Sequence, residues 1–237
     1  MSISEKLTAI AENEQKVYEA GKQSQYDRFW DIYQNRGFRT DYGRAFCGSG
    51  WNDETYKPKY KIAPRQVADY MYAYSNISKL GDMDFSRTVG TFNFTFAYTN
   101  LTEIGEITFN STGTYMLYTF SYSKKLTTVK KLKFNIISEF SNSFVLNESL
   151  KNIVFDGIVA GNINFGNSPL LSKDSIKSIV NALSKTTSGK TITFAREAIN
   201  SAFGIDIDDA TTYPEGSEFY TLRNTKANWN FNFQNYK

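Results

Sequence analysis

Residues 96–109 read FAYTNLTEIGEITF and residues 120–134 read FSYSKKLTTVKKLKF, and both stretches place apolar side chains in the same order. An aromatic residue is followed by a short polar turn, a leucine and a spaced aliphatic row that ends in phenylalanine. The row occurs four times, the last time in a shorter form: Ile77, Leu80, Met83, Phe85; Leu101, Ile104, Ile107, Phe109; Leu126, Val129, Leu132, Phe134; and Leu150, Ile153, Phe155. The aromatic residues that lead the four copies are spaced by 24 residues and are Tyr72, Phe96, Phe120 and Phe144.

A period in the low twenties predicts a solenoid of the leucine-rich repeat type. Each coil of such a solenoid contributes one short strand, one return segment and one inward row of apolar side chains. We therefore predict an α/β solenoid, a leucine-rich repeat stack of about 4–5 coils over residues 70–194. Its outward side chains are not fixed by packing, which favours a binding surface, with a scaffold that has no ligand of its own as the alternative.

The composition excludes several classes of protein. The chain has 41% hydrophobic and 22% charged residues, which does not fit wholesale disorder. Its 27 basic and 24 acidic residues nearly balance, which argues against a nucleic-acid partner. The chain contains one cysteine, Cys47, and no histidine, so thiolate metal clusters and most acid–base catalysis become improbable. We expect no enzyme activity, no cofactor and no bound metal, and we expect Cys47 to be a buried small side chain, not a reactive thiol.

The N-terminal part of the chain predicts helices followed by an irregular connector. Residues 1–37 form the predicted helical docking segment, which ends at Gly37. An amphipathic helix packed on its own chain or on a neighbour is as compatible with this segment as self-association. Residues 38–69 form the predicted connector, which contains Gly, Pro and aromatic residues. The candidate assembly residues of the helical segment are Ile3, Leu7, Ile10, Val17, Phe29 and Trp30.

The C-terminal part predicts a closing unit for the solenoid. In residues 168–194 the sequence has an N-cap candidate at Ser172, apolar residues at helical spacing, and Gly189 before a strand over 191–194. Residues 195–237 form the predicted helix and strand cap, with short helices over 195–204 and 221–228 and a final strand that includes Trp229, Phe231 and Phe233.

The repeat phrases quoted above resemble the coils of BspA-like leucine-rich repeat proteins. The phrase SPLLSKDSIKSIVNALSKTTSGKTITF looks like a terminal unit of that family. The opening phrases EKLTAIAENEQKVYEAGK, QYDRFWDIYQNRG and FCGSGWNDETYKPKY are similar to N-terminal segments of such proteins encoded in phages and prophages of gut Firmicutes, often near tail genes. The chain departs from the common pattern because a Cys or Asn is not present in the polar turn of each coil, and because the compressed fourth repeat predicts a less regular sheet there.

The candidate ligand-binding residues are polar side chains between the fixed apolar positions, together with aromatic residues of the connector. The polar set is expected in neighbouring coils on one face of the sheet, where it would form a strip for sugars or a protein loop, with simple solvation as the alternative. The candidates are Asp82, Asp84, Glu106, Thr108, Lys131, Lys133, Asp156, Trp51, Tyr56 and Tyr60. The acidic group Asp206, Asp208 and Asp209 is interpreted as a solvated turn, because it lacks the glycine and the distal glutamate of a calcium loop.

The resemblance implies a non-catalytic phage tail-associated protein. Its repeat surface would contact a host cell-surface glycan or protein, and its N-terminal helices would dock to other virion or tail proteins or form a homo-oligomer. The alternatives are a structural virion component without receptor binding and a bacterial surface adhesin or interaction module. The N-terminus lacks the pattern of a signal peptide and no apolar stretch approaches 18 residues, so we expect synthesis in the host cytoplasm and no membrane insertion.

Overall fold

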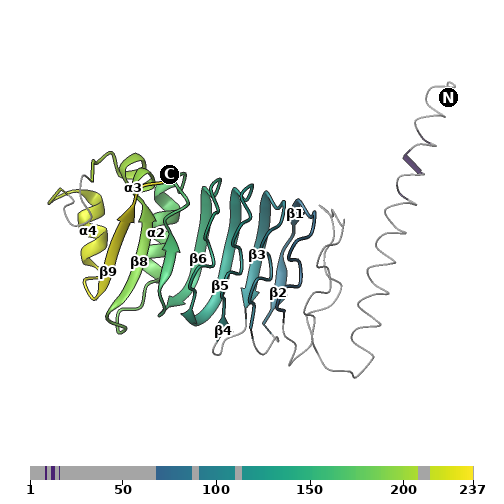
Figure 1. Ribbon diagram of the computed structural model, residues 1–237, viewed down its shortest axis with the longest axis horizontal. Coiled ribbons are helices and arrows are strands. Elements are labelled where there is room, and N and C mark those ends of the chain that lie inside the picture. The colour runs from purple at the N-terminus through teal and green to yellow at the C-terminus, as the bar shows by residue number, and fades with distance from the viewer. Residues whose placement is uncertain are drawn as a thin grey trace.

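The fold is seen in a computed structural model of the chain (Figure 1). The structure describes residues 68–86, 91–109, 114–207 and 214–236, and in addition Ala9, Glu12, Asn13 and Lys16. These four isolated residues are helical and exposed, as expected for their segment. From residue 68 onward the chain winds as a parallel β-solenoid of about four turns, followed by a C-terminal unit that contains helices.

One side of the solenoid is a parallel sheet of six strands. The strands are β1 (Lys79–Leu80), β2 (Met83–Phe85), β3 (Glu103–Phe109), β4 (Thr114–Tyr115), β5 (Thr128–Glu139) and β6 (Asn152–Val159). Equivalent members of the apolar row lie in register, so that Leu80 pairs with Ile104, Ile104 with Val129, and Val129 with Ile153. All members of the row are buried. The predicted shift of 24 or 25 residues per coil is therefore confirmed.

Each coil returns through a second run of chain, over residues 68–75, 92–99, 116–123 and 140–147. The aromatic residues that lead the repeats lie at the centres of these runs and form a buried column: Tyr72, Phe96, Phe120 and Phe144. Successive rings are nearly parallel, with centroids 5.5, 5.2 and 5.2 Å apart. Phe85 at the end of β2 meets the ring of Phe96 edge-on, at 6.4 Å between centroids. The sheet and the second runs thus enclose one apolar core.

Buried hydroxyl groups satisfy the carbonyl oxygens of these second runs. The Oγ1 of Thr95 donates to the carbonyl of Ala68 at 2.8 Å, and the Oγ1 of Thr119 donates to the carbonyl of Phe92 at 2.8 Å. In the next coil Ser143 donates in the same way to the coil before it. Because an unpaired buried carbonyl is costly, this column of hydroxyl groups explains why polar residues recur inside the core.

The helix α2 (Lys173–Ala182) covers the open edge of β6. The amide N–H of Ile153 donates to the Oγ of Ser175 at 2.9 Å, and the N–H of Phe155 donates to the Oγ of Ser178 at 2.9 Å. The Oγ of Ser175 in turn donates to the carbonyl of Lys151 at 3.1 Å. Serine hydroxyls on one helix face therefore replace the backbone groups of a further strand.

A second parallel sheet continues the line of the second runs. It contains β7 (Ile163–Phe165), β8 (Lys190–Ala195) and β9 (Trp229–Gln234) in that order. The core column extends into it, because Phe165 stacks on Phe144 at 4.6 Å and on Phe194 at 6.1 Å. Two short helices, α3 (Arg196–Phe203) and α4 (Glu218–Asn224), complete the C-terminal unit.

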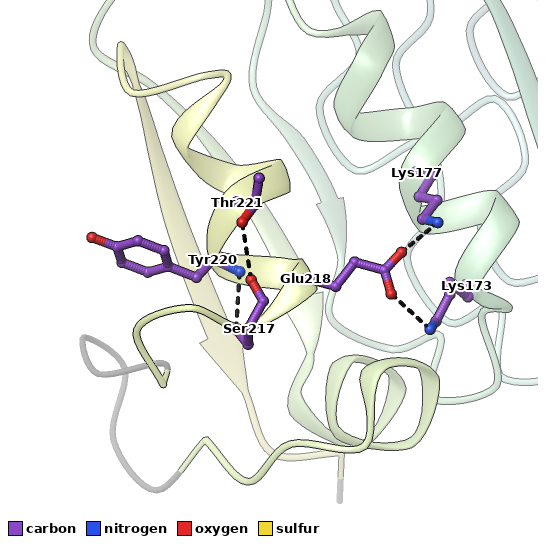
Figure 2. Close-up of polar contacts among 6 residues, drawn as sticks. All are labelled: Lys173, Lys177, Ser217, Glu218, Tyr220 and Thr221. Atoms are coloured by element: carbon purple, nitrogen blue, oxygen red, sulfur yellow. Dashed lines mark hydrogen bonds and ion pairs between the residues drawn. The ribbon is translucent and has the colours of Figure 1, made fainter.

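Polar contacts attach α4 to α2 (Figure 2). Ser217 caps the start of α4, where its Oγ accepts from the N–H of Tyr220 at 3.1 Å. The carboxylate of Glu218 reaches α2, with Oε2 3.0 Å from the Nζ of Lys173 and Oε1 2.5 Å from the Nζ of Lys177. These ion pairs join residues of two elements that are more than 40 positions apart in the sequence.

Several predicted features of the C-terminal part are confirmed. The Oγ of Ser172 accepts from the N–H of Ser175 and caps α2, α3 lies within the range expected for it, and β9 is the expected final strand. The helix predicted over 221–228 is wrong in position, because α4 begins at residue 218 after its serine cap and ends at residue 224.

The coils also depart from one expectation and agree with another. An α/β solenoid was expected, but the second runs of the four coils up to residue 147 contain no helix, and α2 lies against the edge of β6, in the place of a further strand. The compressed fourth repeat does disturb the sheet, because the register between β5 and β6 shifts between Val129 and Leu132, and again between Lys133 and Ile136.

Candidate binding surfaces

The structure brings the seven polar candidates of the repeats together on the sheet in two columns. The first column contains Asp84, Thr108, Lys133 and Asp156, each paired in register with the next. The second contains Asp82, Glu106 and Lys131, where the Oδ1 of Asp82 accepts from the N–H of Glu106 at 2.8 Å and Glu106 pairs in register with Lys131. All seven side chains are exposed or half-buried. Their position on neighbouring strands, or for Asp82 between β1 and β2, follows the repeat spacing, as expected.

Charged groups within these columns bind one another. Glu106 is the centre of the cluster: it accepts a short hydrogen bond from the Nζ of Lys133, and its Oε2 lies 3.6 Å from the Nζ of Lys131. The hydrogen bond from Lys133 is the main cause that lowers the pKa of Glu106, and the same bond raises the pKa of Lys133. Both groups therefore stay ionised around neutral pH, and the middle of the strip carries paired charges.

Exposed aliphatic side chains lie beside the charged columns, and the sequence analysis did not identify them. Ile136 and Ile158 are 41% and 45% exposed and pair in register, and Val154 is 42% exposed on β6. Their alternation with Asp156 along β6 is a signal that sequence inspection could have found, because period-2 positions of a strand share one face. The sheet face thus combines apolar side chains with a charged margin, as protein interfaces commonly do.

Two further aromatic columns flank the buried one in the second runs. The first contains Tyr70, Phe94 and Tyr118, with centroids 4.8 and 4.9 Å apart. The second contains Tyr74, Tyr98 and Tyr122, with centroids 4.7 and 4.3 Å apart. Unlike the core column, these rings reach the surface, with Tyr74 54% and Tyr98 38% exposed and the other four half-buried. The sequence shows both columns at the same 24-residue spacing, although only the core column was recognised there.

All six of these residues have left-handed backbone geometry, with φ between 55° and 60°. This conformation costs about 1–2 kcal/mol per residue for most side chains, and glycine or asparagine normally occupies it. Hydrogen bonds on both sides of the residue hold it there. The N–H of Phe94 donates to the carbonyl of Leu117 in the next coil at 3.0 Å, and the carbonyl of Phe94 accepts from the N–H of Ala97 at 3.1 Å. The fourth coil has Asn142 and Leu146 at the equivalent positions.

The remaining predicted site residues lie mostly outside the described part of the chain. Trp51, Tyr56, Tyr60 and Cys47 belong to residues that the structure does not describe, as do the assembly candidates Ile3, Leu7, Ile10, Val17, Phe29 and Trp30. Of the acidic group at 206–209, the described Asp206 accepts from the Nδ2 of Asn200 at 3.2 Å.

The described residues contain no group of three or more acidic, Cys or His side chains that could hold a metal ion. Nor is any helix in this part of the chain both long and apolar enough to span a lipid bilayer. Comparison with known protein families, with curated proteins and with solved structures finds no match to this chain.

Proposed function

We propose that the chain is a non-catalytic, tail-associated protein of a phage or prophage, whose solenoid contacts the host cell surface. Residues 1–37 dock it to other virion proteins or to a second copy. The resemblance of the opening phrases to phage-encoded proteins supports the location, and the sheet face supports a contact role.

The observation that carries the contact role is the pair of outward columns on the sheet, with Ile136, Val154 and Ile158 beside them. Exposed aliphatic groups on a sheet lower solubility unless a partner covers them, and paired charges such as Glu106 and Lys133 suit the rim of an interface. A partner that buries this face gains apolar contact and does not have to desolvate isolated charges, because these charged groups are already paired with one another.

We propose further that the coils belong to the BspA-like leucine-rich repeat type. The buried leucines Leu101, Leu126 and Leu150, which begin three of the four rows, and the parallel sheet built at this period support the assignment. The assignment can be checked on one feature, the absence of helices in the second runs of the four coils, when the structure of a relative is solved.

A structural virion component is the second candidate. The internal ion pairs of the sheet favour it, because a strip whose charges are already paired offers fewer groups to a new ligand. A bacterial adhesin or interaction module is a third reading of the same surface. Adjacent tail genes in the source genome would support the virion location, and their absence would favour the adhesin.

The test compares capture of bacteria by the protein and by two variants. In the double variant Ile136→Ser/Ile158→Ser, two exposed apolar groups of the sheet face are removed. The matched control is Leu170→Ser, which removes an exposed leucine (57% exposed) outside the sheet. We expect immobilised wild-type protein and the control to capture cells or purified cell walls from a panel of gut Firmicutes, and the double variant to lose capture by about ten-fold. Capture by none of the three, together with binding to virion proteins, would favour the structural candidate.

A further inference from the structure

The two exposed aromatic columns occupy positions where the backbone geometry disfavours such side chains. Neither column is needed to fill the core, because the buried column between them does so. The fourth coil has no aromatic residue at either position, since Asn142 and Leu146 occupy the same left-handed geometry there. Three successive coils with bulky aromatic side chains at such strained and partly exposed positions point to a use at the surface.

The rings of the two columns reach the surface as stacks. Rings within a column stack on one another with interplanar angles of 7° to 12°, so their faces are largely covered by their neighbours. Five of the six residues are tyrosines, so nearly every coil offers a phenolic hydroxyl that can donate and accept. Some of these hydroxyls already have partners, since the Nδ2 of Asn142 donates to the hydroxyl of Tyr118 at 3.1 Å, and Tyr98 and Tyr122 are hydrogen-bonded to each other.

The margins of this aromatic surface contain amides, an ion pair and the carboxylate of Asp69, which accepts from the Oγ1 of Thr91 at 2.8 Å and from the N–H of Asn93 at 2.7 Å. The Nδ2 of Asn100 donates to the Oδ1 of Asn76 at 2.6 Å, which continues the 24-residue spacing beside Tyr74 and Tyr98. In the next coil the equivalent position is Lys124, whose Nζ lies 3.1 Å from the Oε1 of Glu148. Burial raises the pKa of Tyr98, and the charge interaction and hydrogen bond with Tyr122 raise it further, so this phenol stays neutral at physiological pH.

We infer that this surface, made of Tyr70, Phe94, Tyr118, Tyr74, Tyr98 and Tyr122, binds a linear neutral polysaccharide that lies along the solenoid axis. The coils repeat every 4.3 to 4.9 Å at these rings, a spacing similar to the length of one sugar unit in an extended chain. Successive sugars can therefore meet equivalent ring edges, phenols and amides in successive coils. An uncharged surface of hydroxyl, amide and aromatic groups matches a ligand of hydroxyls and C–H groups.

The sheet face and the aromatic surface differ in chemistry and therefore suit different classes of ligand. The sheet face has aliphatic groups with a charged margin, which suits a protein partner, whereas the aromatic surface is neutral. The inference does not depend on the proposed function of the sheet face, and each surface is tested with its own variants. If the sheet variant loses cell capture but still binds sugar, the contact role of the sheet face stands independently of the aromatic surface. If an aromatic variant loses sugar binding but still captures cells, the sugar site stands independently of the sheet face.

The test measures binding of the full chain to neutral polysaccharides by affinity electrophoresis, with cellulose derivatives, soluble chitin, xylan and mannan as probes. Oligosaccharides of a polysaccharide that binds are then titrated by calorimetry. We expect affinity to rise with length from one sugar to three or four, because three coils carry the aromatic residues. A charged polymer such as polygalacturonate should bind more weakly.

The variants are chosen so that folding and binding can be separated. Tyr98→Asn places at the left-handed position a residue that tolerates it, and we expect a folded protein with about ten-fold weaker binding. Tyr98→Phe keeps the stacked ring and removes only the hydroxyl, and it should also weaken binding. The control is Tyr115→Asn, at a tyrosine that is 47% exposed but outside both columns, which should bind as the wild type does.

Three results would overturn the inference. The first is that no neutral polysaccharide of the panel binds to the wild-type chain. The second is that folded Tyr98→Asn and Tyr98→Phe bind as tightly as the control. The third is that these variants lose binding to a protein of the host surface while sugars have no effect, which would assign the aromatic surface to a protein partner.

Discussion

At the scale of single residues, the fold depends on positions where one coil touches the next through its backbone. Gly105 in β3 is such a position. A Cβ there would lie 2.6 Å from the carbonyl carbon of Gly81 and 2.7 Å from the amide nitrogen of Asp82 in the preceding coil. The repeat pattern predicts which apolar residues point inward, but it does not identify this glycine, because the contact arises from the bend between β1 and β2.

We therefore predict that Gly105→Ala destabilises the solenoid. The added methyl group forces the backbone of the neighbouring coil to move, since a bend cannot relax as a flexible side chain can. The expected loss in free energy of unfolding is about 1–3 kcal/mol, measured by urea denaturation. An unchanged denaturation midpoint would show that the coils are further apart at this bend than described.

At the scale of elements, capping residues and long-range contacts fix the C-terminal unit. Ser172 and Ser217 could be assigned as caps from sequence, although only the first was, and the missed second cap is why α4 was predicted too late in the chain. The pairing of Glu218 with two lysines of α2 was not predictable, because it joins segments about 45 residues apart through the fold. The burial of Lys226 was not predictable for the same reason, because its Nζ donates to the carbonyl of Asn181, 45 residues earlier, at 2.9 Å.

The pairing of Glu218 predicts a pH-dependent stability. Its hydrogen bonds with Lys177 and then Lys173 lower the pKa of this carboxyl in the folded chain. The carboxylate therefore stabilises the fold above its unfolded pKa of about 4.3, and the effect is lost as the pH falls through the lower, folded pKa. We expect Glu218→Gln to melt below the wild type at pH 7, and the difference to vanish in acid.

Glu215→Gln is the matched control for this measurement, because Glu215 is exposed near the same helix. Thermal melts followed by circular dichroism at pH 7 and below pH 4 provide the comparison. A gap between wild type and Glu218→Gln that persists unchanged in acid would contradict the assigned role of the ion pairs.

At the scale of the whole molecule, the repeat period predicted the stack, its register and the buried aromatic column. These features follow from local sequence, because each coil repeats the same burial pattern and pairs with its neighbour. The conformation of the second runs did not follow, since left-handed geometry at residues such as Phe94 and Tyr98 is stabilised by hydrogen bonds between coils and contradicts their own preferences.

The proposed docking role predicts the effect of removing residues 1–35. The solenoid has its own core from residue 68 onward, so the shortened chain should remain folded. Its binding to virion partners, or its self-association, should be abolished. Light scattering measures the second outcome, and retention of an oligomer of the full-length size after the deletion would refute the docking role.

Helix α2 also determines how long the stack can be. Its serines, Ser175 and Ser178, engage the amide groups through which β6 would otherwise recruit an extended chain, so this edge offers no template to a neighbouring molecule. Duplication of a 24-residue unit ahead of the helix would lengthen the stack and leave its terminus intact. The number of coils can thus change during evolution without exposing an unpaired strand edge at this end of the sheet.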